Sequence, residues 1–317
     1  MNMTGTGPLV TCIITSYRRE KRIVGRALDS ILKQTYSPLE ILVIDDNRGD
    51  NAGHYSEGIM ELISGRTGIT VIKTENGHGG QYARNTGIRH AKGEYIAFLD
   101  DDDEWLPEKI EKQVKLLNEH PDCGMCYTDG YRVYDDIKHA QRELIHSNYF
   151  KESLSFRELL HEDRIGSTSQ AMIRRSTFDT VGGFDTDMPA RQDYEMWLRI
   201  SRSFPIRGIS EGLYLYHRNS DEGKITRNWR KNVEAHRLIG EKYRVDIKGD
   251  RSAEFNVVFH IAHYYKEGSR TEKQWKIQGI CIINALAYYL ISFIISPSYF
   301  FRQAGYMIDS IRRKRSI

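Results

Sequence analysis

The first hundred residues alternate between short apolar runs and stretches with helical spacing. Four apolar runs predict strands, at 9–15, 40–44, 69–73 and 94–99. Three stretches in which apolar residues recur every three or four positions predict helices, at 23–32, 53–64 and 79–91. Strands and helices that alternate in this way indicate an α/β fold with a parallel, doubly wound sheet and right-handed crossovers.

The pattern becomes less regular after residue 105. Pro107 starts a helix that continues to about residue 119, because proline is tolerated in the first helical turn. Further helices are predicted at 153–160 and 192–203, and short strands at 124–127, 170–173, 206–209 and 213–217. From about residue 227 the pattern is helical to the end. We therefore expect an α/β domain over residues 1–225 and a helical C-terminal region over 226–317.

An uncharged apolar run of 17 residues, from Gly279 to Ile295, lies in this helical region. It is shorter than the roughly 20 residues that cross a bilayer. We expect a buried helix hairpin that turns at Pro297. Aromatic residues on both sides of Pro297 and a basic chain end leave two alternatives open, a segment on a membrane surface and a dimer interface. The basic residues are Arg312, Arg313, Lys314 and Arg315.

Composition and charge exclude several classes of protein. Hydrophobic residues make up 39% of the chain and charged residues 28%, a balance that argues against disorder and against a polytopic membrane protein. The formal net charge is +3, and without the four basic residues at the chain end it is 3 − 4 = −1. Because no basic field covers the protein, we expect no nucleic-acid partner.

Cysteine usage and the N-terminus favour a reducing, cytoplasmic environment. Four cysteines are too few for a disulfide framework. The single C-G-M-C at 123–126 has no second pair of ligands, so we expect buried thiols there instead of a zinc or redox site. The first residues show neither the basic nor the apolar part of a signal peptide.

Polar side chains gather where three of the predicted strands end. They are Thr15-Ser16-Tyr17, Asp45-Asp46-Asn47 and Asp100-Asp101-Asp102-Asp103. In doubly wound sheets ligands bind at the carboxyl ends of the strands. Four consecutive aspartates repel one another unless a cation neutralises them, and carboxylate oxygens suit Mg²⁺ or Mn²⁺. The alternative is a solvated acidic loop that caps the next helix.

Seven motifs occur in the order typical of one family. Those of the first part are VTCIITSYRR at 10–19, ILVIDDN at 41–47, ARNTGI at 83–88 and GEYIAFLDDDD at 93–103. Those of the second part are VGGFD at 181–185, RQDYEMWLR at 191–199 and LYHR at 215–218. Together they resemble the inverting, metal-dependent family 2 glycosyltransferases of the GT-A fold, of the type that builds bacterial polysaccharides such as O-antigen. The resemblance implies a nucleotide-sugar half over about 1–120 and an acceptor half over about 121–225.

The resemblance also implies the nucleotide ligands. The donor is a nucleoside diphosphate sugar, usually of UDP, whose base and ribose contact Thr15 and Tyr17. Asp46 matches the carboxylate that accepts a hydrogen bond from the uracil imide, a task that suits an acceptor-only group. Asp45 is expected to be a turn or cap residue. Arg84 matches a basic position near the nucleotide, and a surface helix charge is the alternative.

Metal binding is assigned within the acidic run in the same way. By resemblance Asp102 ligates Mn²⁺ or Mg²⁺, Asp100 contacts the ribose or the metal, and Asp101 faces the donor sugar. The register within the four aspartates stays open by one residue. His217 matches a histidine near the diphosphate or metal, with a structural role as the alternative. The metal neutralises the leaving diphosphate.

Asp193 matches the catalytic base of the family. Inversion in one displacement needs a single proton acceptor for the acceptor hydroxyl. Gln192 stands where the family commonly has Glu, which leaves the role of residue 192 open. The alternative for Asp193 is an acidic residue that interacts favourably with the N-terminus of its helix.

The expected partners are a nucleotide-sugar donor, a saccharide or lipid-linked saccharide acceptor, the inner face of the cell membrane and a second copy of the chain. Two other functions compete with this prediction. A sugar-nucleotide nucleotidylyltransferase typically has a Gly-rich loop after the first strand, and TSYRRE at 15–20 contains no glycine. A non-catalytic sugar-nucleotide or glycan-binding module would lack the acidic run or Asp193, and both are present.

Overall fold

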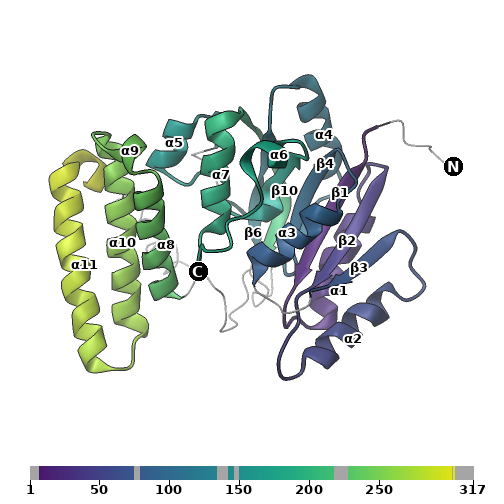
Figure 1. Cartoon of the computed structure of the whole chain (residues 1–317), viewed down its shortest axis with the longest axis horizontal. Helices are drawn as coiled ribbons and strands as arrows, with labels where there is room; N and C mark the ends of the chain where they lie inside the picture. Colours follow the sequence, from purple (N-terminus) through teal and green to yellow (C-terminus); the bar gives the residue numbers. More distant parts are fainter. Residues whose placement is uncertain are drawn as a thin grey trace. The chain divides into compact units, whose positions relative to one another are not determined.

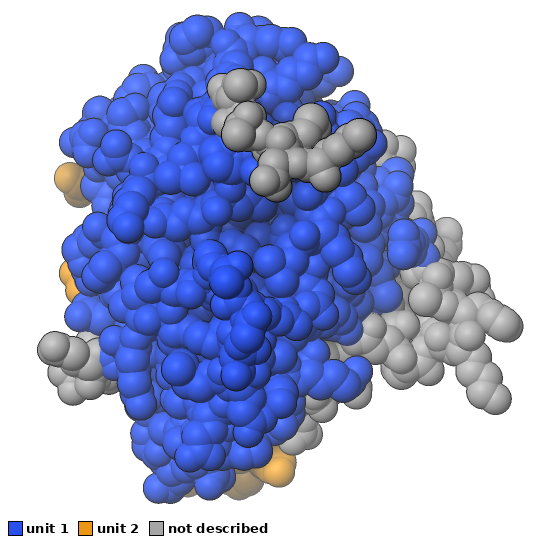
Figure 2. All heavy atoms as spheres, turned by 90° about the vertical axis from the view of Figure 1, so that its right-hand side faces the viewer, with its two compact units in different colours: residues 1–156, 164–186, 196–220 blue, residues 157–163, 187–195, 221–317 orange. Residues whose placement is uncertain are grey.

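The computed structural model describes residues 7–74, 79–133, 142–145, 150–217, 228–301 and 303. The chain divides into two compact units. Figure 1 shows the whole chain as a ribbon, and Figure 2 shows mainly the first unit, as blue spheres. The first unit contains residues 1–156, 164–186 and 196–220, and the second contains 157–163, 187–195 and 221–317. Arg218 and the four basic residues of the chain end lie outside the described residues.

The first unit is built around a mixed, mostly parallel sheet, which confirms the predicted fold class. Four parallel strands form one side, in the order β3 (Ile69–Lys73), β2 (Leu39–Asp45), β1 (Val10–Ser16) and β4 (Tyr95–Asp100). Each predicted strand of the first hundred residues appears within one residue of its expected position. For β1, β2 and β4 the side-chain pattern of a strand buried on both faces was sufficient, whereas β3 is a partly exposed edge strand.

The other side of the sheet is less regular. β9 (Ala171–Arg174) runs antiparallel between β4 and β6 (Met125–Val133), and β10 (Ile206–His217) continues parallel to β6. The two short strands predicted at 206–209 and 213–217 are in fact this one strand. Its register against β6 shifts on both sides of Gly212, and such bulges interrupt the alternation from which strands are recognised.

Three two-residue strands complete the sheet. β5 (Glu104–Trp105) and β8 (Ser153–Leu154) pair with β10, and β7 (Glu143–Leu144) pairs with β6. None of them was predicted, because two residues are too few to show a period of two.

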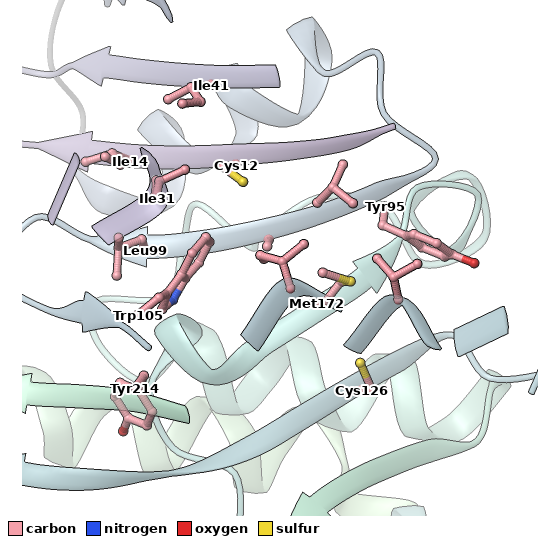
Figure 3. Packing of buried hydrophobic residues seen from close by; sticks show 14 of the residues in the cluster. Cys12, Ile14, Ile31, Ile41, Tyr95, Leu99, Trp105, Cys126, Met172 and Tyr214 are labelled. Carbon is pink, nitrogen blue, oxygen red and sulfur yellow. The ribbon is translucent and has the colours of Figure 1, made fainter. Parts of the chain in front are cut away.

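Helices cover both faces of the parallel strands. Cys12 and Ile14 of β1 point to one face, where they join a core with α1 (Lys21–Leu32) and α4 (Lys109–Glu119) (Figure 3). Ile13 points to the other face, against α3 (Gly80–His90). A Cβ at Gly87 of α3 would lie 2.7 Å from Ile13, so only glycine lets this helix approach the sheet so closely. The arrangement is doubly wound, as the alternation predicted.

The remaining helices of the first 203 residues are α2 (Ala52–Ile63), α5 (Phe156–His161), the 3₁₀ turn η1 (Thr168–Gln170), α6 (Thr177–Val181) and α7 (Gln192–Ser203). Of these, α2 and α7 have 12 residues each and the others are short. All four cysteines are buried and free, as expected. The thiols of Cys123 and Cys126 donate to backbone carbonyls inside the first unit, which is typical of structural cysteines.

The second unit is helical in its C-terminal part, as predicted. Its helices are α8 (Trp229–Lys242), α9 (Arg244–Ile247), α10 (Arg251–Thr271) and α11 (Trp275–Ile295). Segment 157–163 is joined to α10 by Asn256, which donates to the carbonyl of Leu160 at 2.9 Å. Segment 187–195 contributes Tyr194, whose hydroxyl accepts from the same amide at 3.1 Å. Two segments from the middle of the chain therefore pack with the C-terminal helices.

The prediction of a buried helix over the apolar run was wrong. α11 is exposed along most of its length, and only 17% of its most apolar 18-residue window is buried. Within the described residues it is the one helix long and apolar enough to cross a membrane. The chain does turn at Pro297, as expected. The rings of Tyr299 and Phe300 lie against Phe255 and Phe259 of α10. Hydrophobicity alone could not show which side of α11 faces water.

Candidate active site

The carboxyl ends of β1, β2 and β4 bring together the polar residues predicted there. Thr15 pairs in register with Asp100, and Ser16 pairs with Asp45. The amide of Asp46 then donates to the carbonyl of Ser16 at 3.0 Å. Backbone pairing of parallel strands thus fixes the positions of all three motifs at one edge of the first unit.

Asp46 is a buried acceptor at this edge. Its two carboxylate oxygens accept from the Thr74 hydroxyl at 2.7 Å and from the Gly79 amide at 3.2 Å. Each oxygen keeps further lone pairs, so the group can accept another N–H. Asp45 accepts from both nitrogens of Asn47 and closes the turn, which confirms the role expected for it.

Tyr17 presents its ring to solvent directly after β1. It is 41% exposed, and the guanidinium groups of Arg18 and Arg48 lie 5.4 Å and 5.6 Å from the ring centre. An exposed aromatic ring with two cations near it can stack on a planar base and attract an anion. Thr15, the second-last residue of β1, is half-buried.

The acidic run forms a tight turn, in which the amide of Asp103 donates to the carbonyl of Asp100 at 3.1 Å. Asp100 accepts from Arg84 of α3 at 2.6 Å and from the hydroxyls of Ser167 and Thr168. Arg84 is buried and its guanidinium lies over the Phe184 ring, so the alternative of a surface charge was wrong.

Arg19 holds the middle of the acidic run. Its guanidinium donates to Asp101 at 2.9 Å and to Asp102 at 3.1 Å. Burial raises the pKa of Asp101 to about 7, and the Arg19 cation opposes this rise. Asp101 is buried, whereas Asp102 is partly exposed. The sequence contained no signal for this pairing, because it depends on how the loop after β1 folds.

Ser169 is a second contact that sequence reasoning missed. Its hydroxyl donates to the buried carboxylate of Asp103 at 2.6 Å and accepts from the amide of Asp100 at 3.1 Å. Its carbonyl accepts from the indole of Trp105 at 2.9 Å. The run of hydroxyl residues at 167–169, directly before a predicted strand, was the available signal.

His217 ends β10 and is buried. Its Nε2 lies 2.6 Å from Glu104, the residue that follows the acidic run, and this hydrogen bond lowers the pKa of Glu104. Arg26 links the pair to the run, because it lies 3.4 Å from Glu104 and donates to the carbonyl of Asp102 at 3.0 Å. The role predicted for His217 toward the diphosphate or metal remains a prediction.

The chemistry of the acidic turn fits a divalent cation. No three His, Cys, Asp or Glu side chains surround a common point in the described part of the chain. Asp102 and Asp100 nevertheless offer hard oxygen ligands, and Mg²⁺ or Mn²⁺ usually takes its other ligands from water and substrate phosphate. The residues present thus fit a metal that binds together with a diphosphate.

The VGGFD motif packs against α3 next to Arg84. Asn85 donates to the carbonyl of Phe184 at 2.8 Å and accepts from its amide at 2.7 Å. A Cβ at Gly183 would lie 2.4 Å from the Asn85 oxygen, which explains the glycine. Two motifs about a hundred residues apart therefore form one rigid contact beside the site.

Asp193 belongs to the second unit and lies in the first turn of α7. Its carboxylate accepts from the following amide of Tyr194 at 2.8 Å, as an acidic residue near a helix N-terminus does. Arg191 precedes it with a left-handed backbone (φ 55°) and lies 3.6 Å from Asp163. The role of Asp193 as a base is not tested by these contacts.

Comparison with known proteins agrees with the geometry. The model of "Glycosyl transferase family 2" matches residues 11–182. The chain is 26% identical over 289 residues to the UDP-Glc:alpha-D-GlcNAc-diphosphoundecaprenol beta-1,3-glucosyltransferase WfgD of Escherichia coli, covering 90% of this chain and 92% of WfgD. It is 31% identical over 218 residues to the putative teichuronic acid biosynthesis glycosyltransferase TuaG of Bacillus subtilis, covering 68% of this chain and 81% of TuaG.

Solved structures show the same fold. A structure of residues 1–349 of S. aureus TarS in complex with UDP-GlcNAc superposes with a TM-score of 0.60 at 17% identity, covering 88% of this chain and 80% of that fragment. The mannosyltransferase PcManGT of Pyrobaculum calidifontis, in complex with GDP-Man and Mn²⁺, superposes with a TM-score of 0.53 at 17% identity, covering 98% and 83%. At this identity the likeness concerns the fold alone.

Proposed function

Because the chain belongs to glycosyltransferase family 2, we propose that it transfers a sugar from a UDP-sugar to a hydroxyl of a saccharide acceptor with inversion at the anomeric carbon. One observation carries the proposal: the edge of the sheet joins Tyr17, Asp46 and the acidic turn. An exposed ring, a buried acceptor and a run of carboxylates are the groups that a base, its imide and a metal diphosphate require.

The donor lies along this edge in the proposal. Tyr17 and Thr15 hold the base and ribose, and Asp46 accepts the N–H of the uracil imide. Asp100 contacts the ribose or the metal. The Arg84 guanidinium, which donates to the Asp100 carboxylate at 2.6 Å, holds that carboxylate in place. Asp102 and Asp100 would hold a divalent ion. Its positive charge would stabilise the diphosphate as a leaving group. PcManGT, which shares the fold, is in complex with GDP-Man and Mn²⁺, so GDP-sugars are tested beside UDP-sugars as donors.

Asp193 is the proposed base. As the acceptor oxygen bonds to the anomeric carbon, its proton passes to the Asp193 carboxylate and the bond from that carbon to the UDP oxygen breaks. One displacement of this kind inverts the anomeric configuration and needs no enzyme nucleophile.

The acceptor is proposed to be a lipid-linked saccharide of a bacterial surface polysaccharide, used at the inner face of the cell membrane. WfgD acts on a sugar carried by diphosphoundecaprenol, and TuaG is named for teichuronic acid biosynthesis. The likeness to these enzymes supports the class of acceptor.

A donor screen tests the proposal. UDP- and GDP-sugars are incubated with the enzyme and Mn²⁺, and free nucleotide diphosphate is measured. We expect hydrolysis of one or a few UDP-sugars and, with an acceptor, a product of inverted configuration. Binding of UDP-sugars with neither hydrolysis nor transfer would favour the non-catalytic sugar-nucleotide module instead, and a retained anomer would contradict the single displacement.

A further inference from the structure

The outer side of α11 exposes a continuous apolar surface. Between Gly279 and Ile295 the helix has no charged side chain. Cys281, Ala285 and Ser292 are buried on its inner side. Its outer side, at spacings of three and four residues, consists of Ile283, Leu286, Leu290 and Ile294, which are 68%, 65%, 61% and 69% exposed. We call these four residues the α11 face. Contiguous exposed apolar side chains of this size mark an interaction surface.

We propose that the α11 face docks onto an anionic membrane surface, with the helix lying in the plane of the interface. The helix is flanked by exposed aromatic rings, Trp275 at its start and Phe301 just after its end, and aromatic residues favour the membrane–water boundary. The chain continues beyond residue 303 to a basic end, Arg312 to Arg315, which complements anionic headgroups.

A spanning helix does not fit the contacts of α11. α10 runs beside it, with the rings of Tyr265 and Tyr288 stacked at 5.9 Å and Gln278 donating to the carbonyl of Ser269 at 2.8 Å (Figure 1). α10 carries Glu254, Lys266, Glu267 and Arg270, whose charges would enter the bilayer with it. Directly after α11 the chain turns at Pro297, and Tyr299 and Phe300 pack against α10.

The inference concerns only the second unit and does not rest on the proposed reaction. It is tested without donor or acceptor, by flotation of the full chain with vesicles of phosphatidylcholine and phosphatidylglycerol. The variant Ile283→Gln/Leu286→Gln/Leu290→Gln removes apolar area from the face. We expect its partition coefficient to fall by roughly 100-fold, because three large apolar side chains no longer enter the interface. Val245→Gln in α9, at a residue 85% exposed and off the face, is the matched control and should float like the unaltered protein.

Two further measurements separate the alternatives. Truncation after Ser310 should weaken flotation at low salt and leave the salt-resistant, apolar part unchanged. Alkaline carbonate should release the bound protein, as it does for a helix lying in the interface. Three results would overturn the inference. They are no flotation at any salt, flotation that the triple variant does not change, and a dimer in solution that the triple variant dissociates without any vesicle binding.

Discussion

Asp102 is the side chain that distinguishes a metal site from a solvated acidic loop. Arg19 donates to it at 3.1 Å and so offsets part of the negative charge of the turn. If a divalent ion binds Asp102 together with UDP, ligand binding stabilises the folded protein, by about 2.7 kcal/mol at a ligand concentration 100 times Kd. We expect Mn²⁺ or Mg²⁺ to be required for thermal stabilisation by UDP, and Asp102→Ala to abolish the metal-dependent part.

The matched control is Asp29→Ala, which also removes an aspartate paired with an arginine, Arg66 at 2.8 Å, away from the site. It should lower the melting temperature slightly and leave the UDP shift intact. A metal-dependent shift that survives in Asp102→Ala would place the metal on other ligands.

Lys109 is a fully buried lysine behind the same turn. Its Nζ donates to Gln113 at 2.6 Å and lies 4.3 Å from the Trp105 ring centre, and burial lowers its pKa from 10.5 to about 7. Between these two values the unfolded chain binds more protons than the folded one, so stability rises as pH increases through this window. Lys109→Met should flatten this rise and stabilise the protein below pH 7 by about 1–4 kcal/mol.

Urea unfolding at several pH values on both sides of neutrality measures the effect. Lys112→Met is the control on the same helix, because Lys112 is paired with Glu108 and Glu211 and its pKa is raised to about 12. The control should keep the rise of stability with pH between about 7 and 10. An unchanged profile in Lys109→Met would show that Lys109 does not titrate in this range.

The turn η1 connects the acidic run to β9, and Ser169 makes the connection. Replacement of Ser169 by Ala leaves the buried Asp103 carboxylate without the hydroxyl that donates to it at 2.6 Å. We expect the free energy of unfolding to fall by about 1–3 kcal/mol, because a buried acceptor loses one of its hydrogen bonds. UDP binding with Mn²⁺ should weaken by about tenfold, since the turn that carries Asp100 and Asp102 is less well held.

Ser201→Ala in α7 is the control. It removes only a hydrogen bond to the Leu198 carbonyl within its own helix, which contributes little to stability. Equal effects of the two substitutions on UDP binding would show that η1 does not position the acidic turn.

Strand ends were predictable here and contacts between loops were not. A buried strand shows itself by its own composition, so the ends of β1, β2 and β4, and with them Tyr17, Asp46 and the acidic run, followed from the sequence. The pairing of Arg19 with Asp101 could be predicted only if the path of the loop after β1 were known. Ser169 and Asp103 are 66 residues apart in the sequence, so their contact depends on the whole fold. The exposed side of α11 was missed for a related reason, because a helix that is apolar all round has no polar face to mark solvent.

The residues proposed for donor binding all belong to the first unit, whereas Asp193 belongs to the second. Its carboxylate accepts a hydrogen bond from the amide of Tyr194 in its own helix. Asp193→Asn keeps the shape and this acceptor and removes the ability to take a proton. We therefore expect UDP affinity to be unchanged and turnover to fall by ~10² or more, the usual size for a lost general base. Calorimetry with UDP and Mn²⁺ and a transfer assay at saturating donor measure the two quantities separately.

Asp179→Asn is the matched control, an exposed aspartate in the first turn of α6. It removes the same charge from a helix N-terminus and should change neither quantity. If Asp193→Asn lost UDP affinity and turnover in equal proportion, Asp193 would be a structural or donor-binding residue. If turnover were unchanged, the proton would have to pass to another group, because a single displacement still needs an acceptor for it. Loss of turnover with intact binding is the one result that requires Asp193 to act on the reacting hydroxyl.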